Sequence, residues 1–208
     1  PNTAKRLYFD VIPKNVDEYL SQVAKFQSES DDARLQNAVW HIHNGAPPAE
    51  SVPLSFAILL NLANVCNTED KAVLWGFIAR YAPDASPAKN PVLDDLVGYA
   101  IRYYQDFVKP NKKYRAPDAR ENAALHDLME MLQALPAEAT AEEIQHDVYE
   151  VGKRHEFEPL RAWFSALYEI LFGQEQGPRL GSFIVLYGIP ETVLLIRKVL
   201  AGEDLSAA

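Results

Sequence analysis

The spacing of apolar residues predicts helices along nearly the whole chain. In the segment 15–27, apolar side chains recur every three or four residues, as they do on one face of an α-helix. This stripe consists of Val16, Tyr19, Leu20, Val23 and Phe26. The same period recurs in later segments, so we expect an all-α protein of about nine helices. The nearest candidate for a β-strand is 182–187, a single short run between helical patterns.

Polar caps and helix breakers indicate where the helices begin and end. Ser30 precedes a second helical pattern, which Gly45 and the prolines after it break. One face of this second helix is expected to carry Leu35, Ala38, Val39 and Ile42. A nearly all-apolar helix from about 53 to 65 is expected to lie in the core. Thr68 is expected to cap a helix over 69–81.

The helices are expected to form two subdomains, residues 1–135 and 140–208. The segment 109–117 is polar and has proline near both ends, which is typical of an exposed linker between helices. A long helix follows it and is expected to end near the first boundary. Thr140 and Glu143 have the spacing of a capping box, which predicts that the next helix begins there.

Composition describes an ordinary globular protein and limits its partners. Of 208 residues, 48% are hydrophobic and 24% charged, which excludes a disordered tail or a fibrous repeat. The net charge of −9 has the wrong sign for binding nucleic acid by overall charge, so RNA binding would need a local basic surface. The single cysteine, Cys66, favours a reducing compartment, and we expect a cytoplasmic protein. The longest apolar stretches are too short to span a membrane.

The common catalytic and metal motifs do not emerge from the sequence. His41 and His43 superficially resemble the ATP-binding His-Ile-Gly-His element of class I aminoacyl-tRNA synthetases, which follows a strand and opens a helix. Here they lie at the expected end of a helix, where the helix dipole favours histidine. Glu143 and His146 supply one Glu-x-x-His step, whereas a di-iron bundle needs two. We therefore predict no catalytic residue and no metal ligand. Three glycines four residues apart are interpreted as helix ends: Gly173, Gly177 and Gly181.

Positive charge gathers in the segment 109–120, where five basic side chains stand against one acidic side chain, Asp118. The basic residues are Lys109, Lys112, Lys113, Arg115 and Arg120. Tyr114 lies inside this run, and cations with an interleaved aromatic ring can bind a phosphate backbone and stack a base. The same composition is also typical of a solvated linker, so both interpretations stay open.

A second small basic cluster, Lys153 and Arg154, lies at the expected end of a helix, where it would also complement the helix dipole. Arg161 and Arg179 flank loops of the second subdomain and are candidates for the same ligand. The candidate RNA-binding residues are therefore Lys109, Lys112, Lys113, Tyr114, Arg115, Lys153, Arg154, Arg161 and Arg179.

The two ends of the chain resemble class I lysyl-tRNA synthetases. The stretch AKRLYFDVIPKNVDEYL (4–20) resembles the segment that follows the catalytic domain in that family, and VYEVGKRHEF (148–157) with 160–200 resembles its C-terminus. The resemblance covers essentially the whole chain and is least specific in the middle. Two short motifs, GPRL (177–180) and LYG (186–188), also resemble the tail of glutamyl-tRNA synthetase, whose helical cage binds the anticodon.

This resemblance implies a division of labour. The full enzyme would join lysine to tRNA-Lys with ATP and Mg²⁺ in a domain preceding residue 1, and the start at Pro1 fits a fragment cut after that domain. Both ATP motifs are missing here, so no catalytic residue carries over and no cofactor is expected in this chain. The implied role is binding of the anticodon stem-loop of tRNA-Lys by subdomain 140–208, with subdomain 1–135 on the side of the tRNA stem. Neither DNA nor a membrane is expected as a partner. The alternative, favoured by the overall acidity, is a helical protein-interaction or structural module without RNA contact.

Overall fold

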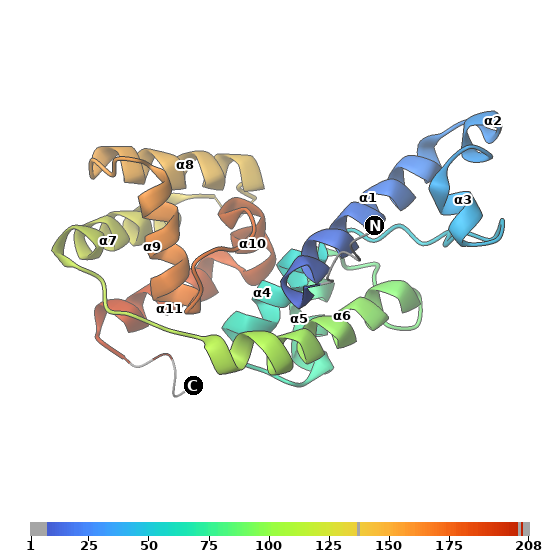
Figure 1. Cartoon of the computed structure of the whole chain (residues 1–208). Helices are drawn as coiled ribbons and strands as arrows, with labels where there is room; N and C mark the ends of the chain where they lie inside the picture. The colour runs from blue at the N-terminus through green and yellow to red at the C-terminus, as the bar shows by residue number, and fades with distance from the viewer. Residues whose placement is uncertain (1–7, 137, 204, 206–208) are drawn as a thin grey trace, which may run out of the picture.

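The computed structural model describes residues 8–136, 138–203 and 205, and throughout these ranges the secondary structure is helical, with no strand (Figure 1). This confirms the all-α expectation. Eleven α-helices lie in the described ranges, and nine of them have eight or more residues. They are α1 (Ile12–Ser28), α2 (Asp31–Arg34), α3 (Ala38–Ile42), α4 (Phe56–Cys66), α5 (Lys71–Tyr81), α6 (Pro91–Tyr103), α7 (Ala119–Ala134), α8 (Ala141–Arg154), α9 (Arg161–Phe172), α10 (Leu180–Tyr187) and α11 (Ile189–Leu200).

Three short turns of helix accompany the α-helices between residues 9 and 111. A 3₁₀ turn, η1 (Phe9–Val11), precedes α1. A π-helical turn, η2 (Tyr104–Val108), and a 3₁₀ turn, η3 (Lys109–Asn111), extend α6 toward the basic segment. The candidate strand 182–187 lies within α10. None of the helices described is both long and apolar enough to cross a membrane.

Buried apolar side chains form two large clusters. The first is built mainly from α4, α5 and α6, and the second from α7 to α11. A third, small cluster joins α1 to α3 through Val23, Phe26 and Val39. Figure 1 shows α1, α2 and α3 extending to one side of the molecule, with α7, α8 and α9 on the opposite side. The expected apolar core helix is confirmed as α4, whose Leu59 and Leu62 are fully buried.

The two large clusters divide the chain before α7. Leu125, Leu128 and Leu132 of α7 belong to the second cluster, and α7 packs against α8 and α11. The expected subdomain boundary, between 135 and 140, would instead place α7 with the first cluster. Along the chain, the change from the first cluster to the second therefore comes in the connection before α7, while the division into subdomains 1–135 and 140–208 stays a prediction.

Helix α10 connects the two clusters through a series of aromatic rings. Phe77 of α5 stacks on Tyr187 of α10 at 5.3 Å between ring centroids, and Tyr187 stacks on Phe183 at 5.3 Å. Phe183 then meets Phe172 of α9 edge-on at 5.2 Å. Asn64 at the end of α4 donates a buried 2.9 Å hydrogen bond to the carbonyl oxygen of Phe172. These contacts pack the two clusters directly against each other.

The capping box expected at the start of α8 is confirmed. The Glu143 N–H donates to Thr140 Oγ1 at 3.2 Å, and the Thr140 N–H donates to Glu143 Oε2 at 2.8 Å. Helix α7 begins with a second box, between Asp118 and Glu121, which the sequence analysis did not identify. Both boxes satisfy backbone donors that have no partner within the helix, and so they set where these helices start.

The expected cap of α5 is wrong by two residues. Asp70, rather than Thr68, caps the helix, because its carboxylate accepts the Ala72 N–H at 2.8 Å. The hydroxyl of Thr68 instead accepts the N–H of Asp70 at 3.1 Å. Threonine and aspartate are both good caps, so composition alone did not separate the two positions.

The expected second helix is broken into α2 and α3. The side chain of Asn37 accepts the Val39 N–H at 3.0 Å and starts α3, so the backbone leaves the helical path between them. The expected apolar face is consequently wrong for Leu35 and Ile42, which are 54% and 65% exposed. Val39 alone of the four expected face residues is buried.

Two of the three spaced glycines have distinct structural roles. Gly173 ends α9 with φ 66°, which confirms the expectation of a helix end. Gly181 lies in the first turn of α10, where an added Cβ would come within 2.0 Å of the carbonyl oxygen of Ala141 at the start of α8. The missing side chain therefore allows α8 and α10 to pack closely.

Candidate nucleic-acid interface

The middle of the basic segment is held against the protein. The Lys113 N–H donates to the carbonyl oxygen of Gly173 at 2.9 Å, and Lys112 Nζ donates to that of Asn64 at 3.0 Å. Lys112 and Tyr114 are half-buried as a result. The expectation of an exposed linker over 109–117 is therefore wrong for these two residues, because the segment runs across the ends of α4 and α9.

Lys112 occupies an aromatic environment. Its ammonium lies 5.4 Å from the ring centroid of Tyr104 and 5.1 Å from that of Tyr114. Burial, together with the smaller effect of the positive charge of Lys109, lowers the pKa of Lys112 to about 8. The ammonium thus contacts two rings and a carbonyl oxygen of the protein.

Lys109 and Arg115 are paired with carboxylates. Arg115 Nη1 and Nη2 donate to Glu121 Oε2 and Oε1 at 2.6 and 2.8 Å, and Arg115 Nε donates to Glu169. The hydrogen bonds to Glu121 raise the pKa of Arg115 and lower the pKa of Glu121. Lys109 Nζ lies 3.0 Å from Glu69 Oε1. A phosphate would have to compete with these carboxylates for either cation.

The second basic cluster lies in the last turn of α8, where the sequence predicted it, and is also paired. Lys153 Nζ lies 2.6 Å from Glu150 Oε1. Arg154 Nη1 donates to both carboxylate oxygens of Asp127, at 2.6 and 2.7 Å, and His155 Nε2 lies 3.1 Å from the same carboxylate. This cluster therefore joins the end of α8 to α7.

Arg161 and Arg179 lie apart from one another. Arg161 is the exposed first residue of α9 and makes no ion pair within the described chain. Arg179 precedes α10, with Nη1 4.0 Å from Glu142 Oε1 near the start of α8. Because α8 has 14 residues and each adds about 1.5 Å, Arg179 and Arg154 lie toward opposite ends of a helix about 21 Å long. The fold thus does not gather all nine candidates at one place.

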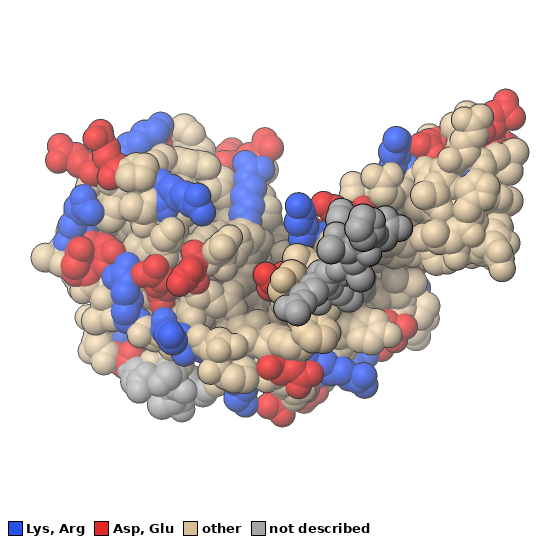
Figure 2. Space-filling view, in the orientation of Figure 1, with Lys and Arg blue, Asp and Glu red and all other residues tan. Residues whose placement is uncertain are grey.

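The charge pattern of one face agrees with this separation. Figure 2 shows Lys and Arg side chains interspersed with Asp and Glu over the face drawn, and a hollow between the arm of α1–α3 and the rest of the molecule. Interspersed charge is the pattern expected of the protein-interaction alternative. Over its described residues, this face therefore carries no continuous basic surface to which RNA could bind.

Three neighbouring candidates do line a common groove. Lys113, Tyr114 and Arg115 border a cavity of about 650 Å³ beside the end of α6 and the loop after α9. The cavity also contains residues that the sequence analysis missed, namely Tyr103, Phe107, Asn111 and Gln174. Tyr103 and Phe107 lie four apart, with ring centroids 4.9 Å from each other. The four-residue spacing of two aromatics beside the basic segment was the available signal.

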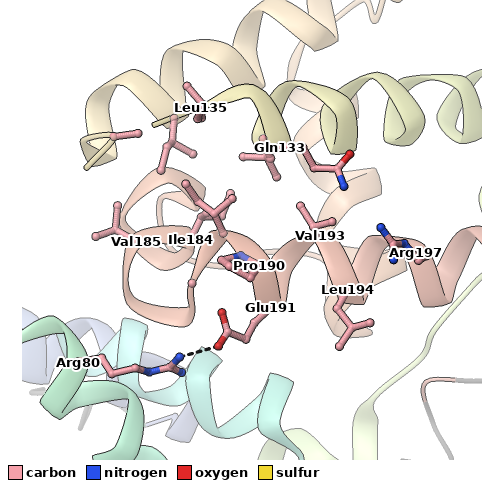
Figure 3. Close-up of a pocket in the computed structure, with 15 residues that line it drawn as sticks. Arg80, Gln133, Leu135, Ile184, Val185, Pro190, Glu191, Val193, Leu194 and Arg197 are labelled. Carbon is pink, nitrogen blue, oxygen red and sulfur yellow. Dashed lines mark hydrogen bonds and ion pairs between the residues drawn. The ribbon is translucent and has the colours of Figure 1, made fainter. Parts of the chain in front are cut away.

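A larger pocket, of about 930 Å³, lies between the end of α7 and helices α10 and α11 (Figure 3). None of the nine candidates lines it. At one end, Arg80 of α5 forms a 2.6 Å ion pair with Glu191 at the start of α11. Gln133 of α7 and Arg197 of α11 are its other prominent polar residues. The sequence signal for Arg197 was its place beside Lys198 in the last turn of the final helix.

The residues that superficially resembled an ATP site do not fit one. His41 lies near the end of α3, and His43 Nε2 is 2.8 Å from the hydroxyl oxygen of Tyr19. No strand precedes them in the part of the chain that the structure describes. The described side chains also contain no group of three or more His, Cys, Asp or Glu placed to hold a metal ion. Burial raises the pKa of the Cys66 thiol to about 12, which makes a reactive thiolate unfavourable.

Comparison with known proteins gives relatives named lysine–tRNA ligase, among them the following three. No family model matches the chain. The chain is 53% identical over 206 residues to a lysine–tRNA ligase of Roseobacter denitrificans, covering 99% of this chain and 39% of the relative. It is 52% identical over 202 residues to that of Rickettsia bellii, covering 96% and 39%. For Rickettsia akari the identity is 49% over 205 residues, covering 98% and 38%. The chain therefore spans less than two-fifths of these relatives.

Proposed function

We propose that this chain is the tRNA-binding, anticodon-recognising part of a class I lysine–tRNA ligase. The supporting observation is an identity of 53% and 52% with two proteins named lysine–tRNA ligase, over nearly the whole chain. In this proposal, ATP- and Mg²⁺-dependent lysylation of tRNA-Lys occurs in the part of the ligase that this chain does not span. The helices described above bind the anticodon stem-loop, and the protein acts in the cytoplasm.

The groove beside the basic segment has chemistry suited to an unpaired loop. Anticodon bases are unstacked, so aromatic rings such as Tyr103 and Phe107 can stack on them while amide groups reach their edges. Of the nine candidate residues, Lys112, Lys113 and Arg161 are the cations that make no ion pair in the described chain, and of these only Lys113 and Arg161 are exposed to a phosphate. Their number predicts a weak dependence of binding on salt, about −0.7 to −0.9 in log–log slope per neutralised phosphate.

The test is binding of a fluorescent lysine anticodon stem-loop, measured by anisotropy against a stem-loop with all three anticodon bases replaced. We expect the lysine sequence to bind at least about tenfold more tightly, because wrong bases leave hydrogen-bonding groups unpaired. Equal affinity for the two loops would contradict recognition of the anticodon. Lys113→Ala should weaken binding of both loops, whereas Lys89→Ala, which removes an exposed lysine outside the groove, should not.

A second candidate function is a protein-interaction module without RNA contact. The interspersed charges in Figure 2 favour it, since a dedicated RNA surface would show basic side chains together. The same binding experiment separates the two functions. An absence of detectable stem-loop binding at low salt would favour the interaction module.

A further inference from the structure

The pocket in Figure 3 has an apolar interior, with the polar side chains of Gln133 and Arg197 at its edge. Its walls come from helices α5, α7, α8, α10 and α11 and from the turn after α7, and the apolar members include Leu135, Ile184, Val185, Val193 and Leu194. A cavity of about 930 Å³ is ample for one nucleobase. Leu194 is 52% exposed, so the pocket opens to solvent along an apolar rim.

The polar groups of the pocket divide into satisfied and available ones. Arg80 and Glu191 hold each other at 2.6 Å, and Arg80 also lies 4.6 Å over the ring of Phe77. By contrast, the side chains of Gln133 and Arg197 make no hydrogen bond or ion pair with any other described residue. Figure 3 shows both side chains on the side of the pocket away from the Arg80–Glu191 pair. The pocket thus presents one amide and one guanidinium for a ligand.

These groups favour a neutral, planar ligand over an anion. Glu191 lines the same pocket, so a phosphate would meet a carboxylate as well as the single available guanidinium. A flat base instead places its faces against the apolar walls and its edge toward Gln133 and Arg197. Arginine offers only donors, whereas glutamine offers donors and one acceptor. Uracil offers two carbonyl acceptors and one N–H donor, which this combination complements.

We propose that this pocket binds one unstacked uracil of the anticodon, with Arg197 and Gln133 reading its edge. The proposal rests on the proposed function and assigns base specificity to residues outside the basic segment. Gln133 Oε1 accepts the base N–H, and the Arg197 guanidinium donates to O4, the carbonyl oxygen that cytosine lacks. Cytosine has an amino donor in place of that carbonyl and an acceptor nitrogen in place of the N–H, so its amino group would face the donors of Arg197 and its ring nitrogen would face the acceptor Gln133 Oε1.

The experiment measures dissociation constants for a UUU anticodon stem-loop and for three stem-loops that each carry one U→C replacement. For the unmodified chain we expect one of the three replacements to weaken binding by about tenfold, the cost of an unpaired polar group. Arg197→Ala and Gln133→Ala should bring that ratio close to one. Lys198→Ala removes the same charge from the neighbouring residue, which does not line the pocket, and should keep the ratio.

The outcomes separate the pocket from the wider function. Arg197 is exposed, so its variant should retain the unfolding midpoint of the unmodified chain, which circular dichroism checks. A contradicting result is that Arg197→Ala and Lys198→Ala weaken binding of all four stem-loops alike, with the ratio of dissociation constants between the U and C loops unchanged. In that case Arg197 acts by charge alone and the pocket proposal is wrong. If the unmodified chain binds none of the loops, the proposed function fails and the pocket proposal falls with it.

Discussion

At the scale of single residues, the basic segment shows how the environment changes what a side chain can do. Lys112 has a side chain of the type that binds phosphate. Its ammonium nevertheless faces the rings of Tyr104 and Tyr114 and the carbonyl oxygen of Asn64. Arg115 likewise binds Glu121 and Glu169, which lie 6 and 54 residues away. The fold brings both carboxylates to Arg115, so the composition of the basic segment could not reveal these ion pairs.

Lys112 should give the protein a measurable pH dependence of stability. Its pKa falls from 10.5 to about 8 on folding, so between these pH values the unfolded chain binds more protons than the folded one. The free energy of unfolding should therefore rise from pH 8 to pH 10 relative to that of Lys112→Met. Urea unfolding of the two proteins at several pH values measures the difference. Lys113→Met is the control from the same segment, and a pH-independent difference for Lys112→Met would contradict the assignment.

Arg115 should contribute to stability more than its exposed neighbour. Arg115→Ala leaves the nearly buried carboxylate of Glu121 without its guanidinium, so we expect a loss of about 2 kcal/mol in the free energy of unfolding. Lys113→Ala removes an exposed side chain and should cost less than about 0.5 kcal/mol. Similar values for both variants, from urea titration, would show that the Arg115 contacts are weak in solution.

At the scale of helices, local signals predicted some boundaries and missed others. The Thr140–Glu143 box marked the start of α8 because both partners lie within one turn. The apolar spacing ran unbroken past Asn37, so the break between α2 and α3 was missed. The sequence also could not predict which helices pack together, because α7 contacts α11 through residues that no local pattern pairs. The pocket near Arg197 depends on that packing and was missed for the same reason.

The close packing of α8 and α10 predicts that replacing two helical glycines by alanine changes stability in opposite directions. Gly181→Ala places a Cβ 2.0 Å from the Ala141 oxygen, so the helices must separate, and we expect a loss of about 1–3 kcal/mol in stability. Gly76→Ala in α5 meets nothing within 4 Å and should stabilise the protein by about 0.5–1 kcal/mol through helix propensity. Thermal unfolding of both variants measures this, and a stable Gly181→Ala protein would be the contradicting result.

At the scale of the whole molecule, acidity and RNA binding are compatible only if few contacts carry the recognition. The chain has a net charge of −9, and most candidate cations are already paired with carboxylates. Nonspecific attraction to RNA should therefore be weak, and discrimination must come from shape and base edges. The ring series through α10 joins the two apolar clusters, so the groove and the pocket are carried on one packed body.

The most direct test of anticodon binding is a chemical footprint of a full-length tRNA-Lys transcript in the presence of this chain. We expect protection of the anticodon-loop bases, with the acceptor stem as reactive as in free tRNA. Protection of the acceptor stem without the anticodon loop, or an unchanged pattern at a chain concentration that saturates binding, would contradict it.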